Sequence, residues 1–171
     1  MESERVSAQY LAGFFDGEGC VHIHSCIRKG GQHRKRYKAR VTITNTHLPT
    51  LQAIAAQYGG KVYARVHGEY YAGREVRQSW NLNWDVQEEV VKVLKAIQPY
   101  LIQKKAQVDY FLAEYLQTMK DRKGAYHLSD AEYAKRADIH TKLQQMKKEE
   151  FKAATPFQRA PIVEGDNKWL S

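Results

Sequence analysis

The sequence contains no apolar run that approaches the ~20 residues needed to cross a bilayer, which excludes a membrane-spanning helix. Its two cysteines, Cys20 and Cys26, are too few for a disulfide framework or a four-cysteine zinc site. The N-terminus lacks the basic start and the apolar stretch of a secretory signal. These absences predict a soluble protein that works inside the cell, in a reduced compartment, with no visible targeting signal.

Acidic residues are missing from one long segment. Between Gly19 and Gly68 lie nine of the chain's 27 basic residues and none of its 19 acidic residues. The segment therefore carries a charge of +9 and the rest of the chain −1, which together give the net charge of +8. A stretch of one sign favours a polyanionic partner, with DNA or RNA ahead of a membrane surface. A generic basic surface is the alternative.

The length of 171 residues suits one domain with a substantial core. The 43% of hydrophobic and 11% of aromatic residues exclude disorder throughout. We expect a single domain over residues 1–153, with a core over about 7–119 and a helical extension over about 120–153. Residues 154–171 are expected to form a partly ordered tail.

Alternating apolar and polar residues predict two β-hairpins, over 20–44 and 61–84. Between and around them, apolar residues at helical spacing predict helices over 8–16, 49–58, 86–97, 101–119 and 130–153. Ser7 is expected to cap the first helix, and the pairs Asp85 with Glu88 and Ser129 with Glu132 to form capping boxes. The order predicts an α+β fold in which helices cover one face of a four-stranded antiparallel sheet.

The other face of the predicted sheet gathers basic and hydrogen-bonding side chains. Arg and Lys can reach guanine edges in a major groove, which accommodates a two-stranded ribbon. About half of such side chains contact only phosphate or solvent. The pair His22 and His24 supplies only half of a zinc site. By strand alternation, the candidate DNA contacts are His22, His24, Arg28, Lys38, Arg40, Thr42, Tyr63, Arg65, His67, Arg77 and Ser79.

Residues 11–19 read LAGFFDGEG, an apolar helical segment that runs into two acids between glycines. Carboxylates at the C-terminal end of a helix face the negative end of its dipole, and a bound divalent cation would offset that repulsion. Gly13 and Gly17 are four residues apart, a spacing that lets two helix backbones approach closely. The helix partner is either another part of the same chain or a second copy of this helix.

The LAGFFDGEG segment resembles the signature of the LAGLIDADG homing endonucleases. The ITNT segment at 43–46, and QPYL at 98–101 followed by Lys104 and Lys105, are similar to further blocks of the single-motif members. The predicted elements also fit the αββαββα core of this family, so the resemblance spans roughly residues 7–119. A single motif copy implies a homodimer joined through the motif helices. The implied interface residues are Leu11, Ala12, Gly13, Phe14, Asp16 and Gly17.

The resemblance also implies a divalent-metal-dependent endodeoxyribonuclease, which hydrolyses one phosphodiester in each strand of a long pseudo-palindromic site. Glu18 matches the acid that binds the metal, and Gly17 the position whose carbonyl helps to coordinate it. Mg²⁺ suits such oxygen ligands, and Mn²⁺ or Ca²⁺ can occupy the same site. Asn45 matches a residue that organises water, and Lys104 a basic residue near the scissile phosphate. Asp16 is expected to have a structural role.

The leading hypothesis is therefore a homing endonuclease that binds double-stranded DNA and promotes the mobility of its own intron or intein gene. Such a protein works in the compartment of the host genome, either a prokaryotic cytoplasm or an organelle. The alternatives are a maturase that binds intron RNA and a non-catalytic DNA-binding repressor on the same scaffold. Binding without metal-dependent cleavage would indicate the repressor.

Overall fold

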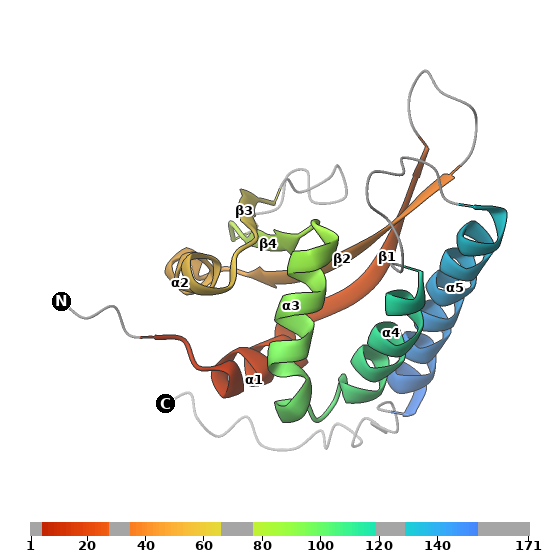
Figure 1. Cartoon of the computed structure of the whole chain (residues 1–171). Helices are drawn as coiled ribbons and strands as arrows, with labels where there is room; N and C mark the ends of the chain where they lie inside the picture. The colour runs from red at the N-terminus through yellow and green to blue at the C-terminus, as the bar shows by residue number, and fades with distance from the viewer. Residues whose placement is uncertain (1–4, 28–34, 66–76, 119–128, 154–171) are drawn as a thin grey trace, which may run out of the picture.

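A computed structural model of the chain describes residues 5–27, 35–65, 77–118 and 129–153 (Figure 1). The predicted order of helices and strands is confirmed. Arg28, His67, residues 119–128, for which helix was predicted, and the predicted tail 154–171 lie outside these ranges. No helix in the described ranges has the length and apolar character needed to span a bilayer. The elements are α1 (Ala8–Glu18), β1 (Gly19–Ile27), β2 (Lys35–Asn45), α2 (Leu48–Tyr58), β3 (Lys61–Ala64), β4 (Trp80–Trp84), α3 (Gln87–Ile97), the 3-10 turn η2 (Gln98–Tyr100), α4 (Lys105–Gln117) and α5 (Asp130–Ala153).

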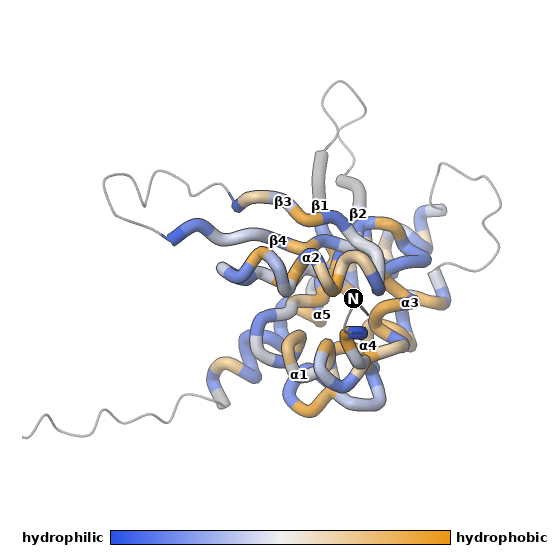
Figure 2. The backbone as a smooth tube through the Cα atoms, turned by 90° about the vertical axis from the view of Figure 1, so that its left-hand side faces the viewer, coloured by the Kyte–Doolittle hydropathy of each residue, from blue (hydrophilic) through white to orange (hydrophobic). Residues whose placement is uncertain are grey.

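The four strands form one antiparallel sheet in the order β1-β2-β4-β3. Of β2, only Val41–Asn45 pairs with β4, so the earlier part of β2 pairs with β1 alone and the two strands form a long ribbon. Figures 1 and 2 show the helices gathered on one side of the sheet. The predicted architecture is therefore confirmed, and the opposite side of the sheet carries no helix of the described chain.

The strand register explains how alternation in the sequence builds the core. Val21, Val41 and Trp84 lie side by side on β1, β2 and β4, and all three are fully buried. The neighbouring inward row contains Ile43 and Leu82, which are also fully buried. Successive side chains of a strand point to opposite faces, so the intervening residues lie on the outer face. Figure 2 shows the corresponding mixture of hydrophobic and hydrophilic residues along the elements.

Helix α1 runs two residues further than expected and leads directly into β1. Ser7 caps its start as predicted, because the Ser7 Oγ accepts a hydrogen bond from the Tyr10 N–H at 3.1 Å. At its end the Gly19 N–H donates to the Phe15 carbonyl. A Cβ at Gly19 would lie 2.1 Å from the Phe15 ring, so only glycine fits this junction without displacing the ring. Glu18 is thereby held at the last position of the helix.

The capping boxes predicted for α3 and α5 have different outcomes. At α5 the box is confirmed: the Ser129 N–H donates to Glu132 Oε2 at 2.9 Å, and the Glu132 N–H donates to Ser129 Oγ at 3.3 Å. At α3 the prediction is wrong. Val86 is the N-cap and no side chain caps the helix, because Asp85 instead pairs with the Arg40 guanidinium of β2.

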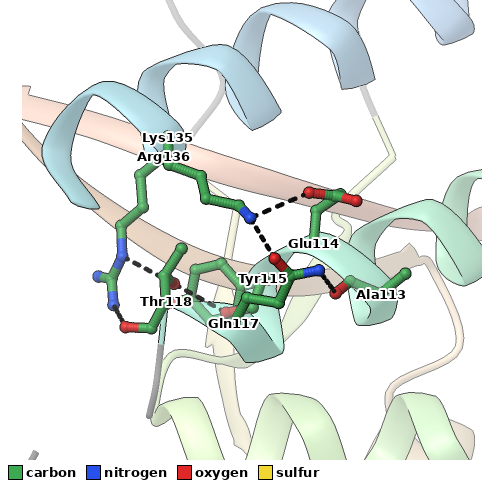
Figure 3. A network of polar contacts seen from close by, with 7 residues as sticks. All are labelled: Ala113, Glu114, Tyr115, Gln117, Thr118, Lys135 and Arg136. Carbon is green, nitrogen blue, oxygen red and sulfur yellow. Dashed lines mark hydrogen bonds and ion pairs between the residues drawn. The ribbon is translucent and has the colours of Figure 1, made fainter. Parts of the chain in front are cut away.

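Two neighbouring cationic residues of α5, Lys135 and Arg136, contact the C-terminal end of α4 (Figure 3). Lys135 lies 3.2 Å from the Glu114 carboxylate. The buried Arg136 donates from Nε to Thr118 Oγ1 at 3.2 Å and from Nη1 to the Tyr37 carbonyl at 3.2 Å. Its guanidinium also lies 4.9 Å from the centre of the Tyr115 ring. These contacts dock α5 against α4 and β2.

Candidate active site and nucleic-acid interface

The two acids of the motif have different surroundings. Asp16 Oδ2 accepts hydrogen bonds from the N–H groups of Ile102 and Gln103, at 2.7 and 3.3 Å, and Oδ1 accepts one from the Lys104 N–H at 2.9 Å. Glu18 is exposed and makes no hydrogen bond or ion pair with the described residues. The structural role expected of Asp16 is thus confirmed, and Glu18 keeps both carboxylate oxygens free for a ligand.

Hydrogen bonds to Asp16 hold Lys104 beside the C-terminal end of α1. It is the N-cap residue of α4, and its ammonium group donates to the Asp16 carbonyl near the end of α1. Carbonyls at a helix C-terminus carry partial negative charge, which favours a cation there. The half-buried side chain of Lys104 therefore lies beside the end of the helix that carries Glu18.

Asn45 reaches this region through the sheet. The β1–β2 register pairs Gly19 with Ile43, so Asn45 lies two residues beyond, next to the junction of α1 and β1. Its Oδ1 accepts a hydrogen bond from the His47 N–H at 2.8 Å, and its two Nδ2 hydrogens bond no described residue. The structure therefore brings Gly17, Glu18, Asn45 and Lys104, far apart in sequence, to one end of the sheet.

The exposed strip of α1 differs from the interface expected from the sequence. Leu11 and Ala12 have no exposed area within one protomer, so their placement in a dimer interface is corrected: both belong to the core. The residues that α1 leaves at the surface include Tyr10, which is 52% exposed and stacks on Phe14 with ring centres 5.9 Å apart. Gly13 and Gly17 complete this strip, and a Cβ at either would meet nothing within 4 Å.

The outer face of the sheet carries most of the predicted DNA contacts. Lys38, Tyr63, Arg65 and Arg77 are exposed, and His24 is half-buried. Arg40 is held by Asp85, and the Thr42 hydroxyl donates to Asn83 Oδ1 at 2.8 Å. The strand pairing also aligns a polar row of this face that begins at Cys20, two residues after Glu18, and it includes an exposed lysine absent from the predicted contacts. The row consists of Cys20, Thr42, Asn83 and Lys61.

Ser79 departs from the expected outward orientation. It precedes the first residue of β4 and is only 7% exposed, because here the chain is tied by its backbone. The Ser79 carbonyl accepts hydrogen bonds from the Arg65 N–H at 2.8 Å and from Gln78 Nε2 at 2.7 Å. Strand alternation does not extend to this residue, so its side chain is buried rather than presented to solvent.

His22 lies on the outer face at the edge strand β1, opposite Arg40 of β2. Burial, followed by the positive charges of Lys147 and Arg40, lowers the pKa of His22 to about 4, while Asp85 acts in the opposite direction. His22 is therefore neutral at pH 7, with one ring nitrogen that donates and one that accepts. Such a side chain suits a base edge better than a phosphate.

The end of α1 presents two oxygen donors that suit a metal ion. Among the described residues, no three His, Cys, Asp or Glu side chains come together in a way that could hold a metal ion. The exposed Glu18 carboxylate and the Gly17 carbonyl beside it supply hard oxygen donors, which suit Mg²⁺ more than Zn²⁺. The residues present at the end of α1 thus fit a divalent cation of this kind.

Comparisons with known proteins identify the family and the fold. A family model described as LAGLIDADG endonuclease matches residues 11–117. None of the curated proteins matches the chain significantly. Three solved structures share the fold: the homing endonuclease I-TnaI (TM-score 0.58, 19% identity, 85% of this chain and 98% of that one), the LAGLIDADG meganuclease I-CpaMI bound to uncleaved DNA (0.60, 20%, 86% and 50%) and the homing endonuclease I-CvuI in complex with its target in the presence of Ca (0.50, 19%, 80% and 94%).

The family match begins in the motif helix and continues through the sheet to α4, so it contains all the residues that meet at the end of α1. It covers more than half of the chain. The resemblance seen in the sequence is therefore confirmed. The protein is a member of the LAGLIDADG endonuclease family.

Proposed function

We propose that the protein is a site-specific endonuclease that binds double-stranded DNA on the outer face of its sheet and cleaves it beside Glu18. One observation carries the proposal: an exposed carboxylate with no partner among the described residues lies at the helix end to which Lys104 donates, beside a face with basic and polar side chains. Asp16, the other acid of the motif, is fully engaged in positioning this region. Asp16 therefore supports the structure of the site, and Glu18 is available to bind a metal ion.

We propose a homodimer as the active form. The chain covers 98% of I-TnaI but only 50% of I-CpaMI, so two copies of this chain correspond in length to one I-CpaMI chain. The strip of Tyr10, Gly13, Phe14 and Gly17 offers a surface on which two α1 helices can approach closely. A two-fold axis through this strip would bring the two copies of Glu18 together, because in each protomer Glu18 directly follows Gly17 of the strip.

The side chains of this site divide the chemistry between them. Glu18 and the Gly17 carbonyl would hold a divalent cation, which when bound supplies positive charge and lowers the pKa of water. Lys104 faces the region where negative charge develops on a phosphate during hydrolysis and stabilises that charge. Asn45 orients water through its free Nδ2 hydrogens, since an amide cannot act as a base. No covalent intermediate is required.

The test begins with DNA selected for binding. Duplexes retained by the wild-type protein from a randomised library, without divalent metal, are then incubated with the protein and Mg²⁺ or Mn²⁺. We expect cleavage of both strands, and for Glu18→Gln a rate at least about 100-fold lower with binding retained. Glu88→Gln, which changes an exposed acid of α3, is the matched control and should cleave like the wild type.

Retention of selected duplexes without cleavage by the wild type would contradict nuclease activity and favour a DNA-binding repressor. Equal cleavage by the wild type and Glu18→Gln would contradict the assignment of Glu18 as the metal ligand.

A further inference from the structure

Helix α5 lies along the outer edge of the sheet. β1 is an edge strand, so some of its carbonyls have no partner strand. Two of them accept hydrogen bonds from α5: the Ile23 carbonyl from His140 Nδ1 at 2.8 Å, and the Val21 carbonyl from Lys147 Nζ at 2.7 Å. His140 and Lys147 are seven residues apart and therefore share one side of the helix. This side of α5 closes the edge of β1.

Lys147 also brings its charge to the outer face. Its Nζ lies 3.0 Å from Cys20 Sγ, and Cys20 lies on that face of β1, two residues after Glu18 and paired with Thr42. The charge also acts on His22, two residues further along β1. After burial, Lys147 makes the largest contribution to the lowered pKa of His22. A side chain from the C-terminal helix thus reaches the predicted DNA surface, two residues from the candidate metal ligand.

The ammonium group of Lys147 has no anionic partner in the described chain. Its two hydrogen-bond acceptors are a carbonyl and a thiol, and the side chain is half-buried. Two lysines elsewhere differ, since Lys135 pairs with Glu114 and Lys105 with Asp109. Partial burial of a cation without a counter-charge is unfavourable, and an anion bound there would offset that cost.

The end of α5 is held in place on its other side. Glu150 accepts hydrogen bonds from Gln103 Nε2, at 2.7 Å, and from Gln107 Nε2 of α4. Gln103 directly precedes Lys104 and donates its own N–H to Asp16. The last turns of α5 therefore connect the β1 edge with the segment that carries Lys104, and Lys147 is positioned rather than free to move.

We propose that Lys147 binds a phosphate of the DNA strand that crosses β1 beside Glu18, which makes α5 part of the DNA-binding surface. This inference rests on the proposed function, since it assumes that DNA lies on the outer face. The basic and polar side chains of the outer face suit DNA phosphate as the anion. Lys147 lies between the candidate cleavage site at Glu18 and the candidate base contacts on the strands.

The test measures the salt dependence of binding to a mixed-sequence duplex of about 40 base pairs, without divalent metal, since non-specific affinity comes from phosphate contacts. For Lys147→Met, the slope of log affinity against log salt should become shallower by about 1 for each protomer. Lys147→Arg should restore the slope. The matched control Lys142→Met changes an exposed lysine of α5 about 140° round the helix and should leave the slope unchanged.

Circular dichroism at the assay temperature confirms that each variant is folded, so that lost stability is not read as lost phosphate contact. An unchanged slope in folded Lys147→Met, or an equal change in Lys142→Met, would overturn the inference. If the wild type cleaves selected DNA while Lys147→Met keeps the full slope, only this inference fails. If the slope changes but the wild type cleaves no selected duplex, the proposed nuclease function fails and the phosphate contact stands.

Discussion

At the scale of single residues, the two motif acids show how neighbouring backbone decides the role of a carboxylate. Asp16 faces three N–H groups at the start of α4, which together form a site for a negative charge. Glu18, one half-turn further, points to no such groups and remains exposed. The residue types alone do not distinguish the two acids, because both are carboxylates followed by glycine at a helix end.

His22 provides a prediction at this scale. Its folded-state pKa of about 4 lies below the ordinary 6.5, so between these values the unfolded chain binds a proton that the folded chain does not. The stability contributed by neutral His22 is therefore present in full above pH 6.5 and is lost as the pH falls through about 4. Urea unfolding between pH 7 and pH 4 should show a shallower loss of stability for His22→Gln than for the wild type.

A direct check is the titration of the His22 imidazole by NMR in the wild-type protein. A midpoint at or above 6.5 would show that Lys147, Arg40 and burial do not act on the ring as described.

At the scale of elements, the sequence predicts the sheet and the helices well because burial repeats locally. Alternating residues of β1, β2 and β4 and the cap residues Ser7 and Ser129 are all visible in short windows. The failure at α3 has a long-range cause. Asp85 has a cap partner at the correct spacing, but Arg40, 45 residues away, competes for its carboxylate. No local pattern contains that information.

The candidate site was predictable to the extent that a family signature covers it. Glu18, Asn45 and Lys104 were identified by resemblance, whereas the burial of Leu11 and Ala12 was missed because α1 has apolar residues on all sides. Such a helix does not reveal which face meets the core. The role of Lys147 was also invisible, since Cys20 lies 127 residues earlier in the chain.

Helix α5 carries the prediction at this scale. Arg136 is 3% exposed and its planar guanidinium joins Thr118 at the end of α4 to the Tyr37 carbonyl of β2. We expect Arg136→Ala to lower the free energy of unfolding by about 2–4 kcal/mol, because it leaves buried acceptors without donors. Arg136→Lys should recover only part of this loss, since an ammonium group cannot reach both acceptors as the planar guanidinium does.

Urea denaturation measures both variants against Lys142→Ala, an exposed position on the same helix that should change stability by no more than about 0.5 kcal/mol. Equal stability of Arg136→Ala and the wild type would show that α5 does not depend on this contact.

At the scale of the whole molecule, one protomer has a complete core and an incomplete site. The core includes residues from the sheet and from each of the five α-helices of the described chain. The candidate site, by contrast, contains one free carboxylate at the rim of the exposed α1 strip. The proposed assembly of two protomers through that strip would therefore serve cleavage more than stability, and the two effects can be separated by mutation.

Gly13→Leu makes this separation. Within one protomer a Cβ at Gly13 meets nothing within 4 Å, and Leu favours a helix over Gly by up to about 1 kcal/mol, so the variant should fold at least as well as the wild type. Between two closely packed α1 helices, the larger side chain would force the backbones apart. Sedimentation should show a dimer for the wild type and a monomer for Gly13→Leu, with DNA cleavage lost.

Ala113→Leu, at an exposed position on α4, controls for the added apolar surface and should remain dimeric and active. A wild type that sediments as a monomer while cleaving DNA would contradict the shared site, because each protomer then completes its own.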